Sequence, residues 1–228
     1  MATAAWNDMR EPEVAARYTR VAIALHWLIA AAILYNLVSG LLGEYLPGWF
    51  FMFHISSGLS ILALSLIRVG WRLTHRPPPK LPMHRWERWL ANGVHVLLYA
   101  AMLFVPWTGW VMISANPPAG SPGAAYAQAQ RARDAAAKGE PAPTQRKPPM
   151  FLGMVEVPKI APVADLGREP GGVAAQRAFH EQMEGVHERV ALLLLFLLVL
   201  HVAGALKHQL IDRQPELARM GLGRARRR

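Results

Sequence analysis

The segment HERVALLLLFLLVLH, residues 187–201, begins and ends with a histidine and is strongly apolar between its ends. On an α-helix, its 14 steps rise about 21 Å and return to nearly the same face. One helix can therefore place an imidazole near each side of a hydrocarbon core that is about 30 Å thick. The sequence predicts a membrane-spanning helix over 185–210, with His187 and His201 at two depths.

Three further segments are long and apolar enough to cross a membrane, namely 21–42, 49–67 and 89–113, and the fourth span is centred on 187–208. Backbone N–H and C=O groups in hydrocarbon must be paired within the segment, so each span is expected to be helical. The first span is too long for the apolar core of a signal peptide and lacks a small-residue cleavage pattern, so we expect it to be retained. The predicted fold class is an all-α membrane protein, a four-transmembrane-helix bundle.

The formal net charge of +10 lies between the apolar segments and not along a soluble face, which argues against a nucleic-acid partner. Lys and Arg gather in the N-terminal tail, in the link 68–88 and in the C-terminal tail. The short link between the first two spans has neither residue type. Because positively charged loops stay in the cytoplasm, we expect both termini to be cytoplasmic.

The chain divides by composition into a tail 1–20, spans one to three over 21–113, an outer connection 114–184, span four over 185–210 and a tail 211–228. Within the outer connection, an insert at 119–147 is rich in Ala, Pro, Gln and Gly. We expect this insert to be mobile, although part of it has the composition of a helix. The chain has no cysteine, which excludes disulfides, covalently attached c-type haem and thiolate-ligated iron–sulfur clusters.

Four histidines fall at two matched depths once the spans are threaded through the membrane. His26 and His201 lie toward the cytoplasm, whereas His54 and His187 lie near the outer face. Neutral imidazole is a good iron ligand, so two pairs at two depths fit two six-coordinate b-type haems. A single histidine in a span more often forms a hydrogen bond to a neighbouring helix. For the four histidines together, the alternative function is a proton-conducting array. Such an array would usually include Asp or Glu within the spans, and none is present in their uncharged centres.

Several other residues are candidates for contacts with a cofactor. His95 lies in span three and is a candidate for a hydrogen bond to a propionate, a quinone or another helix. His208 is on the same helix face as His201 and is expected beside the cofactor or facing a quinone. Gly58 and Gly204 make room either for a porphyrin face or for close helix packing. Arginine forks match carboxylates, so three arginines are candidates for haem propionates, although positive-inside charge explains them equally well: Arg20, Arg68 and Arg72.

Four short patterns lie in the four spans. They are Tyr18-Thr19-Arg20 with His26-Trp27; His54-Ile55-Ser56-Ser57-Gly58-Leu59-Ser60 with Arg68 and Arg72; His95 with Tyr99, Pro106 and Gly109; and His187-Glu188 with His201 and His208. Together they resemble the bacterial cytochrome b561 family, four-helix di-haem proteins related to the b subunits of nickel–iron hydrogenases and formate dehydrogenases. The resemblance implies a bacterial inner-membrane location, two b-type haems, a quinone partner and four axial ligands: His26, His54, His187 and His201. The outer connection would then be periplasmic, and the insert 119–147 departs from the family pattern.

The function that we expect is electron transfer to or from the quinone pool, with ubiquinone as acceptor. One branch of the resembled family oxidises superoxide, so a superoxide:ubiquinone oxidoreductase is a candidate activity. The alternative is a membrane-anchor cytochrome b subunit that relays electrons for a partner oxidoreductase, with the insert as a docking element. A haem-free transporter requires all four depth-matched histidines to be incidental, and we disfavour it.

Overall fold

The computed structural model describes residues 17–79, 81–141, 143 and 148–223. Parts of the predicted tails 1–20 and 211–228 and of the insert 119–147 therefore lie outside the described residues.

Four long helices dominate the described chain: α1 (Arg20–Leu41), α2 (Gly48–Thr74), α3 (Arg85–Ser114) and α6 (Val173–Leu206). Each is long and apolar enough to cross a membrane, which confirms the predicted fold class. Helix α6 begins at Val173, well before the predicted span 185–210, because the polar residues that precede the span continue the same helix. At 1.5 Å per residue its 34 residues reach about 51 Å, longer than the hydrocarbon core.

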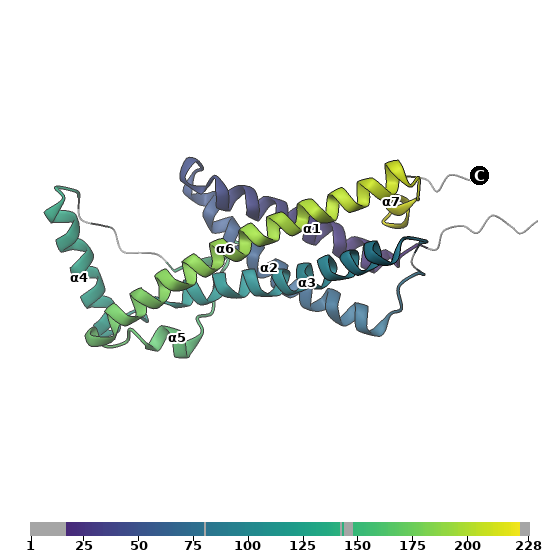
Figure 1. The fold of residues 1–228 in the computed structure, drawn as a ribbon. Coiled ribbons are helices and arrows are strands. Elements are labelled where there is room, and N and C mark those ends of the chain that lie inside the picture. The colour runs from purple at the N-terminus through teal and green to yellow at the C-terminus, as the bar shows by residue number, and fades with distance from the viewer. Residues whose placement is uncertain (1–16, 80, 142, 144–147, 224–228) are drawn as a thin grey trace, which may run out of the picture.

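The helices pack in the order α1 against α2, α2 against α3, and α3 against α6 (Figure 1). All four helices contribute to one buried apolar cluster: Ile29, Ile33, Ile61, Ala101, Met102 and Leu194. In α6, Leu194 lies midway between His187 and His201 in sequence. The core therefore sits in the middle of the bundle, between the two levels at which the histidines lie.

Both ends of the described chain lie at one end of the bundle, which we call the α7 end (Figure 1). Helix α6 continues into a π-helical turn, η3 (Lys207–Ile211), and then into the short helix α7 (Glu216–Arg219). Tyr18 N donates to Arg219 O at 3.3 Å, and Trp27 Nε1 donates to Met220 O at 2.9 Å. The described part of the predicted C-terminal tail is thus folded against the start of α1.

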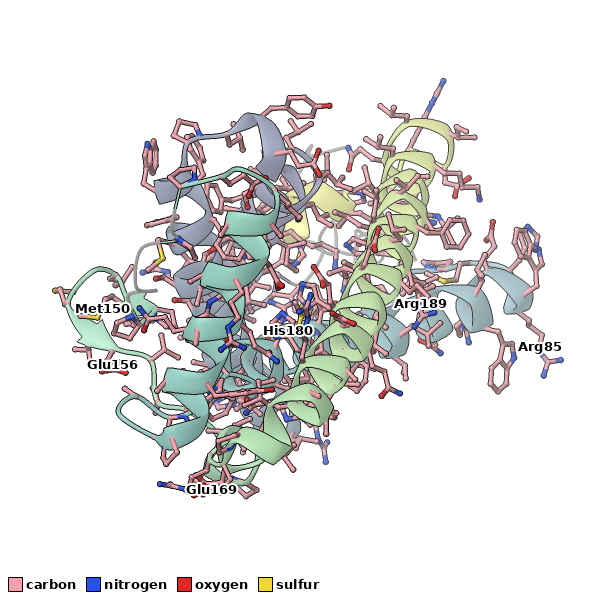
Figure 2. The ribbon with its side chains drawn as sticks, turned by 90° about the vertical axis from the view of Figure 1, so that its left-hand side faces the viewer. Arg85, Met150, Glu156, Glu169, His180 and Arg189 are labelled. Carbon is pink, nitrogen blue, oxygen red and sulfur yellow. The ribbon has the colours of Figure 1, made fainter. Side chains whose placement is uncertain are left out.

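The opposite end, which we call the α4 end, holds the short elements that connect the spans. These are η1 (Gly43–Tyr45), α4 (Pro122–Ala137), the antiparallel strands β1 (Met150–Phe151) and β2 (Val155–Glu156), α5 (Ala161–Asp165) and η2 (Pro170–Gly172). Figure 2 shows α4 beside the N-terminal part of α6, which carries His180. Within the insert 119–147, residues Pro122–Ala137 form a helix, as the composition of this part of the insert allowed.

Two contacts fix the start of α4. Ser121 is its N-cap, and its hydroxyl accepts from Ala124 N at 3.2 Å. Gly123 N donates to Arg168 O at 2.8 Å. A Cβ atom at Gly123 would lie 1.8 Å from Gly167 O, so only glycine allows this approach. The insert is joined to the bundle through its first turn.

Candidate functional site

The two histidine pairs matched by depth face each other across the bundle. At the α4 end, the rings of His54 from α2 and His187 from α6 have centroids 6.4 Å apart, with planes at 66°. At the α7 end, the rings of His26 from α1 and His201 from α6 are 6.2 Å apart, with planes at 73°. All four side chains are half-buried. A single helix, α6, supplies one ring to each pair.

The pair at the α4 end is held by hydrogen bonds to the Nδ1 atom of each ring. Ser39 Oγ lies 2.9 Å from His54 Nδ1 and gives its own proton to a backbone carbonyl one turn earlier. Thr108 Oγ1 lies 3.0 Å from His187 Nδ1 and gives its proton to Val105 O, which is also 3.1 Å from that Nδ1. Each hydroxyl therefore accepts from Nδ1–H. This tautomer leaves the Nε2 lone pair of both rings available for a metal.

The pair at the α7 end has a different environment. Arg68 Nη2 lies 3.4 Å from His26 Nδ1, while its Nη1 donates to Ala22 O at 3.1 Å. A guanidinium only donates, so this contact uses the Nδ1 lone pair of His26. In a neutral ring the proton is then on Nε2. Binding of a metal by His26 Nε2 therefore requires the ring to give up its contact with Arg68 and to carry its proton on Nδ1 instead. The guanidinium also lies over the Tyr99 ring, 5.9 Å from the centroid.

His95 from α3 lies beside the same pair, a proximity that depth alone did not predict. Its ring centroid is 5.1 Å from that of His201, closer than His26. His95 Nδ1 donates to Ala91 O at 2.6 Å, which holds the ring against its own helix. Its side chain is exposed. The α7 end thus brings together three imidazoles, against two at the α4 end.

The remaining predicted residues lie at the α7 end. Arg20 is the first residue of α1 and Arg72 is in the last turn of α2, and both are exposed. His208 is in the π-turn η3, where its Nδ1 lies 2.6 Å from Asp212 Oδ2. The same oxygen accepts from Lys207 Nζ at 2.8 Å. The bond from Lys207, followed by that from His208, holds the pKa of Asp212 below its usual range.

Known proteins related to this chain identify its family. The family described as prokaryotic cytochrome b561 matches residues 17–223. The chain belongs to this family. It is 27% identical over 214 residues to cytochrome b561 homolog 2 of Escherichia coli (strain K12), covering 90% of each protein. It is also 34% identical over 111 residues to cytochrome b562 of Cereibacter sphaeroides, covering 40% of this chain and 63% of that relative.

Family membership and the four long apolar helices make the protein a multi-pass membrane cytochrome of the b type, which contacts lipid and acts in electron transfer. The residues fit the haem that the family implies. Two imidazoles on opposite sides of one metal ion, with bonds of about 2 Å, have centroids roughly 6 Å apart. Both pairs match this spacing, whereas 5.1 Å between His95 and His201 is too short. A Cβ atom added at Gly58 or Gly204 would meet no atom within 4 Å, so both positions border open space.

Sequence reasoning missed the groups that orient these side chains. Ser39 and Thr108 have no spacing that marks them, because their contacts with histidines run between helices. Asp212 did carry a signal, since it follows His208 by four residues. Glu87 is buried in the first turn of α3 and pairs with Lys207, a contact that requires the packing of α3 on α6.

Proposed function

We propose that the protein is a di-haem b-type cytochrome that moves electrons across the bacterial inner membrane to or from the quinone pool. The observation that carries this proposal is the presence of two facing histidine pairs, one at each end of the bundle, with ring separations of 6.2 and 6.4 Å. His26 and His201 would hold one haem, and His54 and His187 would hold the other. A b-type haem supplies reversible one-electron chemistry when it is bound.

The protein's contribution is to position and insulate these ligands. Ser39 and Thr108 fix the tautomer of the histidines at the α4 end, as described above. A haem held between two imidazoles would supply electron transfer and not the binding of a gas. Because His187 and His201 are 14 residues apart on α6, their levels differ by about 21 Å along the helix axis. This arrangement supports transfer between two sides of the membrane.

We place the α7 end on the cytoplasmic side, because the described basic residues of the α2–α3 link and of the segment after α6 lie there. The α4 end then faces the periplasm. We propose that quinone exchanges electrons with the His26–His201 level, where polar side chains from several helices gather. His95 and His208 are the candidates for contact with its head group at this level.

Selective loss of one ligand tests both the haem count and the site of quinone exchange. The His201→Ala protein should keep the haem at the α4 end, which dithionite reduces but a short-chain ubiquinol reduces slowly or not at all. The His187→Ala protein should lose that haem, while ubiquinol still reduces the one that remains.

His180 provides the matched control, because it lies on α6 and its Nδ1 donates to Met112 O at 3.0 Å. His180→Ala should keep both haems and the rate with ubiquinol of the unmodified protein. Fast reduction by ubiquinol in His201→Ala, together with its loss in His187→Ala, would place the exchange at the opposite end. A single haem in the unmodified protein would contradict the di-haem proposal itself.

A further inference from the structure

The first two turns of α3 carry charged and aromatic side chains that the histidine pairs do not use. Arg85, Arg88, Trp89 and Asn92 line a hollow of about 250 Å³ on the surface of the bundle. They are spaced i, i+3, i+4 and i+7, so they form one face of the helix. Pockets for drug-sized ligands are larger, roughly 300–1,000 Å³. The hollow therefore suits a single polar head group.

Both arginines of this hollow are free to bind a ligand. Arg85 and Arg88 are exposed, and neither guanidinium has a hydrogen bond or an ion pair with any residue that the structure describes. Arg68 of α2 differs, because its guanidinium donates to Ala22 O at 3.1 Å inside the bundle. Figure 2 shows Arg85 at the outer edge of the molecule. The hollow thus presents two positive charges to its surroundings.

The acidic residue of this turn does not neutralise the two arginines. Glu87 is buried, with 8% of its surface exposed. Its Oε2 accepts from His84 N at 3.1 Å, and its Oε1 accepts from Lys207 Nζ. The bond from His84 belongs to a capping box that closes the start of α3. A ligand in the hollow would therefore be held by side chains and not by free backbone N–H groups.

The order of residues along this face matches the order of chemical groups in a phospholipid. Trp86 and Trp89 are 64% and 77% exposed, and Trp rings favour the interface between membrane and water. Val96 follows Arg85 by eleven residues, close to three turns, and is 67% exposed. It lies about 10 Å deeper along the axis than Trp89. From the helix start inward, the face is basic, then aromatic, then apolar.

We infer that this hollow binds the head group of an anionic phospholipid in the leaflet at the α7 end. The forked guanidiniums of Arg85 and Arg88 donate to the phosphate oxygens, a geometry that Arg matches well. Trp89 packs beside the glycerol ester region, and an acyl chain runs along the helix past Val96. Basic pockets on the cytoplasmic side of membrane helices bind anionic lipids in this way. Neither histidine pair takes part in the site, whereas its assignment to the cytoplasmic leaflet rests on the proposed orientation.

The test is native mass spectrometry of the detergent-purified protein during titration with dioleoyl phosphatidylglycerol. The Arg85→Gln/Arg88→Gln protein is compared with Arg76→Gln/Arg213→Gln, which removes two exposed arginines from the same end but outside the hollow. We expect the affinity of the first variant to fall about thirtyfold, which corresponds to about 1 kcal/mol for each arginine. The second variant should bind the lipid as the unmodified protein does.

Two further ligands test the chemistry of the head group. Dioleoyl phosphatidylcholine carries the same phosphate beside a cation, so it should bind more weakly and respond less to the loss of Arg85 and Arg88. Glycerol 3-phosphate supplies the phosphate without acyl chains and should not displace the lipid. Displacement by glycerol 3-phosphate at the concentration of the lipid would make the ligand a soluble phosphate, and the lipid assignment would be wrong.

A further variant separates recognition by the arginine forks from simple charge. Arg85→Lys/Arg88→Lys keeps both charges but loses the planar forks, so its affinity should lie between those of the glutamine variant and the unmodified protein. All variants should keep the melting temperature, because the replaced side chains are exposed. Equal loss of lipid in the two glutamine variants would indicate general attraction by positive charge and would overturn the inference. Unchanged affinity in Arg85→Gln/Arg88→Gln would overturn it as well.

Discussion

The hydroxyl groups of Ser39 and Thr108 determine which nitrogen of two histidines is available for a metal. Each hydroxyl donates its hydrogen bond to a backbone carbonyl of its own helix, so a lone pair on its oxygen accepts from the histidine ring. Thr108 has no exposed surface, and Ser39 has 2%. Water therefore cannot replace these contacts without a change in packing. Such partners of a metal-binding histidine fix the ring and tune the metal.

Replacement of Thr108 by Val should raise the reduction potential of the haem at the α4 end while keeping it bound. The hydrogen bond from Nδ1–H strengthens the ring as an electron donor to the oxidised metal, so its loss disfavours the oxidised state. Val105 O still accepts from the ring at 3.1 Å, which should preserve ligation. A spectroelectrochemical titration measures the effect, with Thr74→Val in the exposed end of α2 as control. An unchanged or lower potential would contradict this account of Thr108.

His95 and His26 should differ in their effect on haem content, although His95 lies closer to His201. A separation of 5.1 Å between ring centroids leaves too little room for a metal ion between two imidazoles, whereas 6.2 Å fits. Replacement of His26 by Ala should remove one haem per chain, and replacement of His95 by Ala should remove none. Haem assayed against protein concentration distinguishes them. Loss of haem only from the His95 variant would make His95 the ligand.

At the scale of elements, the ion pairs of Lys207 join α3 to the end of α6. Their contribution to the stability of the fold should depend on pH. The pKa of Asp212 is lowered by Lys207 and then by His208, so the folded state favours its carboxylate. The resulting stability is fully present above about pH 5 and is lost as the pH falls through the lowered pKa. The Asp212→Asn protein should melt below the unmodified protein at pH 7, and the gap should close toward pH 3.

Asp165→Asn is the control for this measurement, because Asp165 forms an exposed pair with Arg168 at the opposite end. Exposed pairs contribute about 0–1 kcal/mol, so this variant should melt close to the unmodified protein. A melting difference for Asp212→Asn that stays constant from pH 7 to pH 3 would show that the carboxylate charge is not the cause.

The contact of α4 with the bundle should depend on Gly123. An alanine Cβ would lie 1.8 Å from Gly167 O, so the Gly123→Ala protein must separate these two segments. We expect a local cost of about 1–3 kcal/mol, typical of overpacking. Hydrogen exchange in Pro122–Ala137 should become faster, while haem content is unchanged. Gly139→Ala just after this helix is a poor control because the φ of Gly139 is +70°, so Gln128→Ala, at an exposed position of the same helix, is preferable.

For the whole molecule, the sequence was sufficient to predict the four spans and the pairing of His26 with His201 and of His54 with His187. Both predictions depend on helix rise and apolar length, which are properties of single segments. The proximity of His95 to His201, the hydroxyl partners and the π-turn depend on how helices rotate against one another. The span lengths do not contain that information. The docking of α4 likewise depends on the close approach at Gly123.

The orientation of the whole bundle is testable with reporters that function on one side of the membrane. Alkaline phosphatase requires disulfides, which form in the periplasm and not in the cytoplasm. A fusion after Gly139 should therefore be active, and one after Pro77 inactive, if the α4 end is periplasmic. Fusions of a fluorescent protein that matures in the cytoplasm should give the reverse pattern. Activity after Pro77 would invert the proposed orientation, and with it the side of the membrane nearest the proposed quinone exchange.

The most direct test of the central claim is the amount and type of haem bound by the full chain. The detergent-purified protein is assayed for haem per polypeptide and its dithionite-reduced minus oxidised spectrum is recorded. The account predicts two haems of the b type per chain, both with the spectrum of six-coordinate, low-spin iron. One haem per chain, or a high-spin spectrum that shows an open coordination position, would contradict the assignment of two facing histidine pairs.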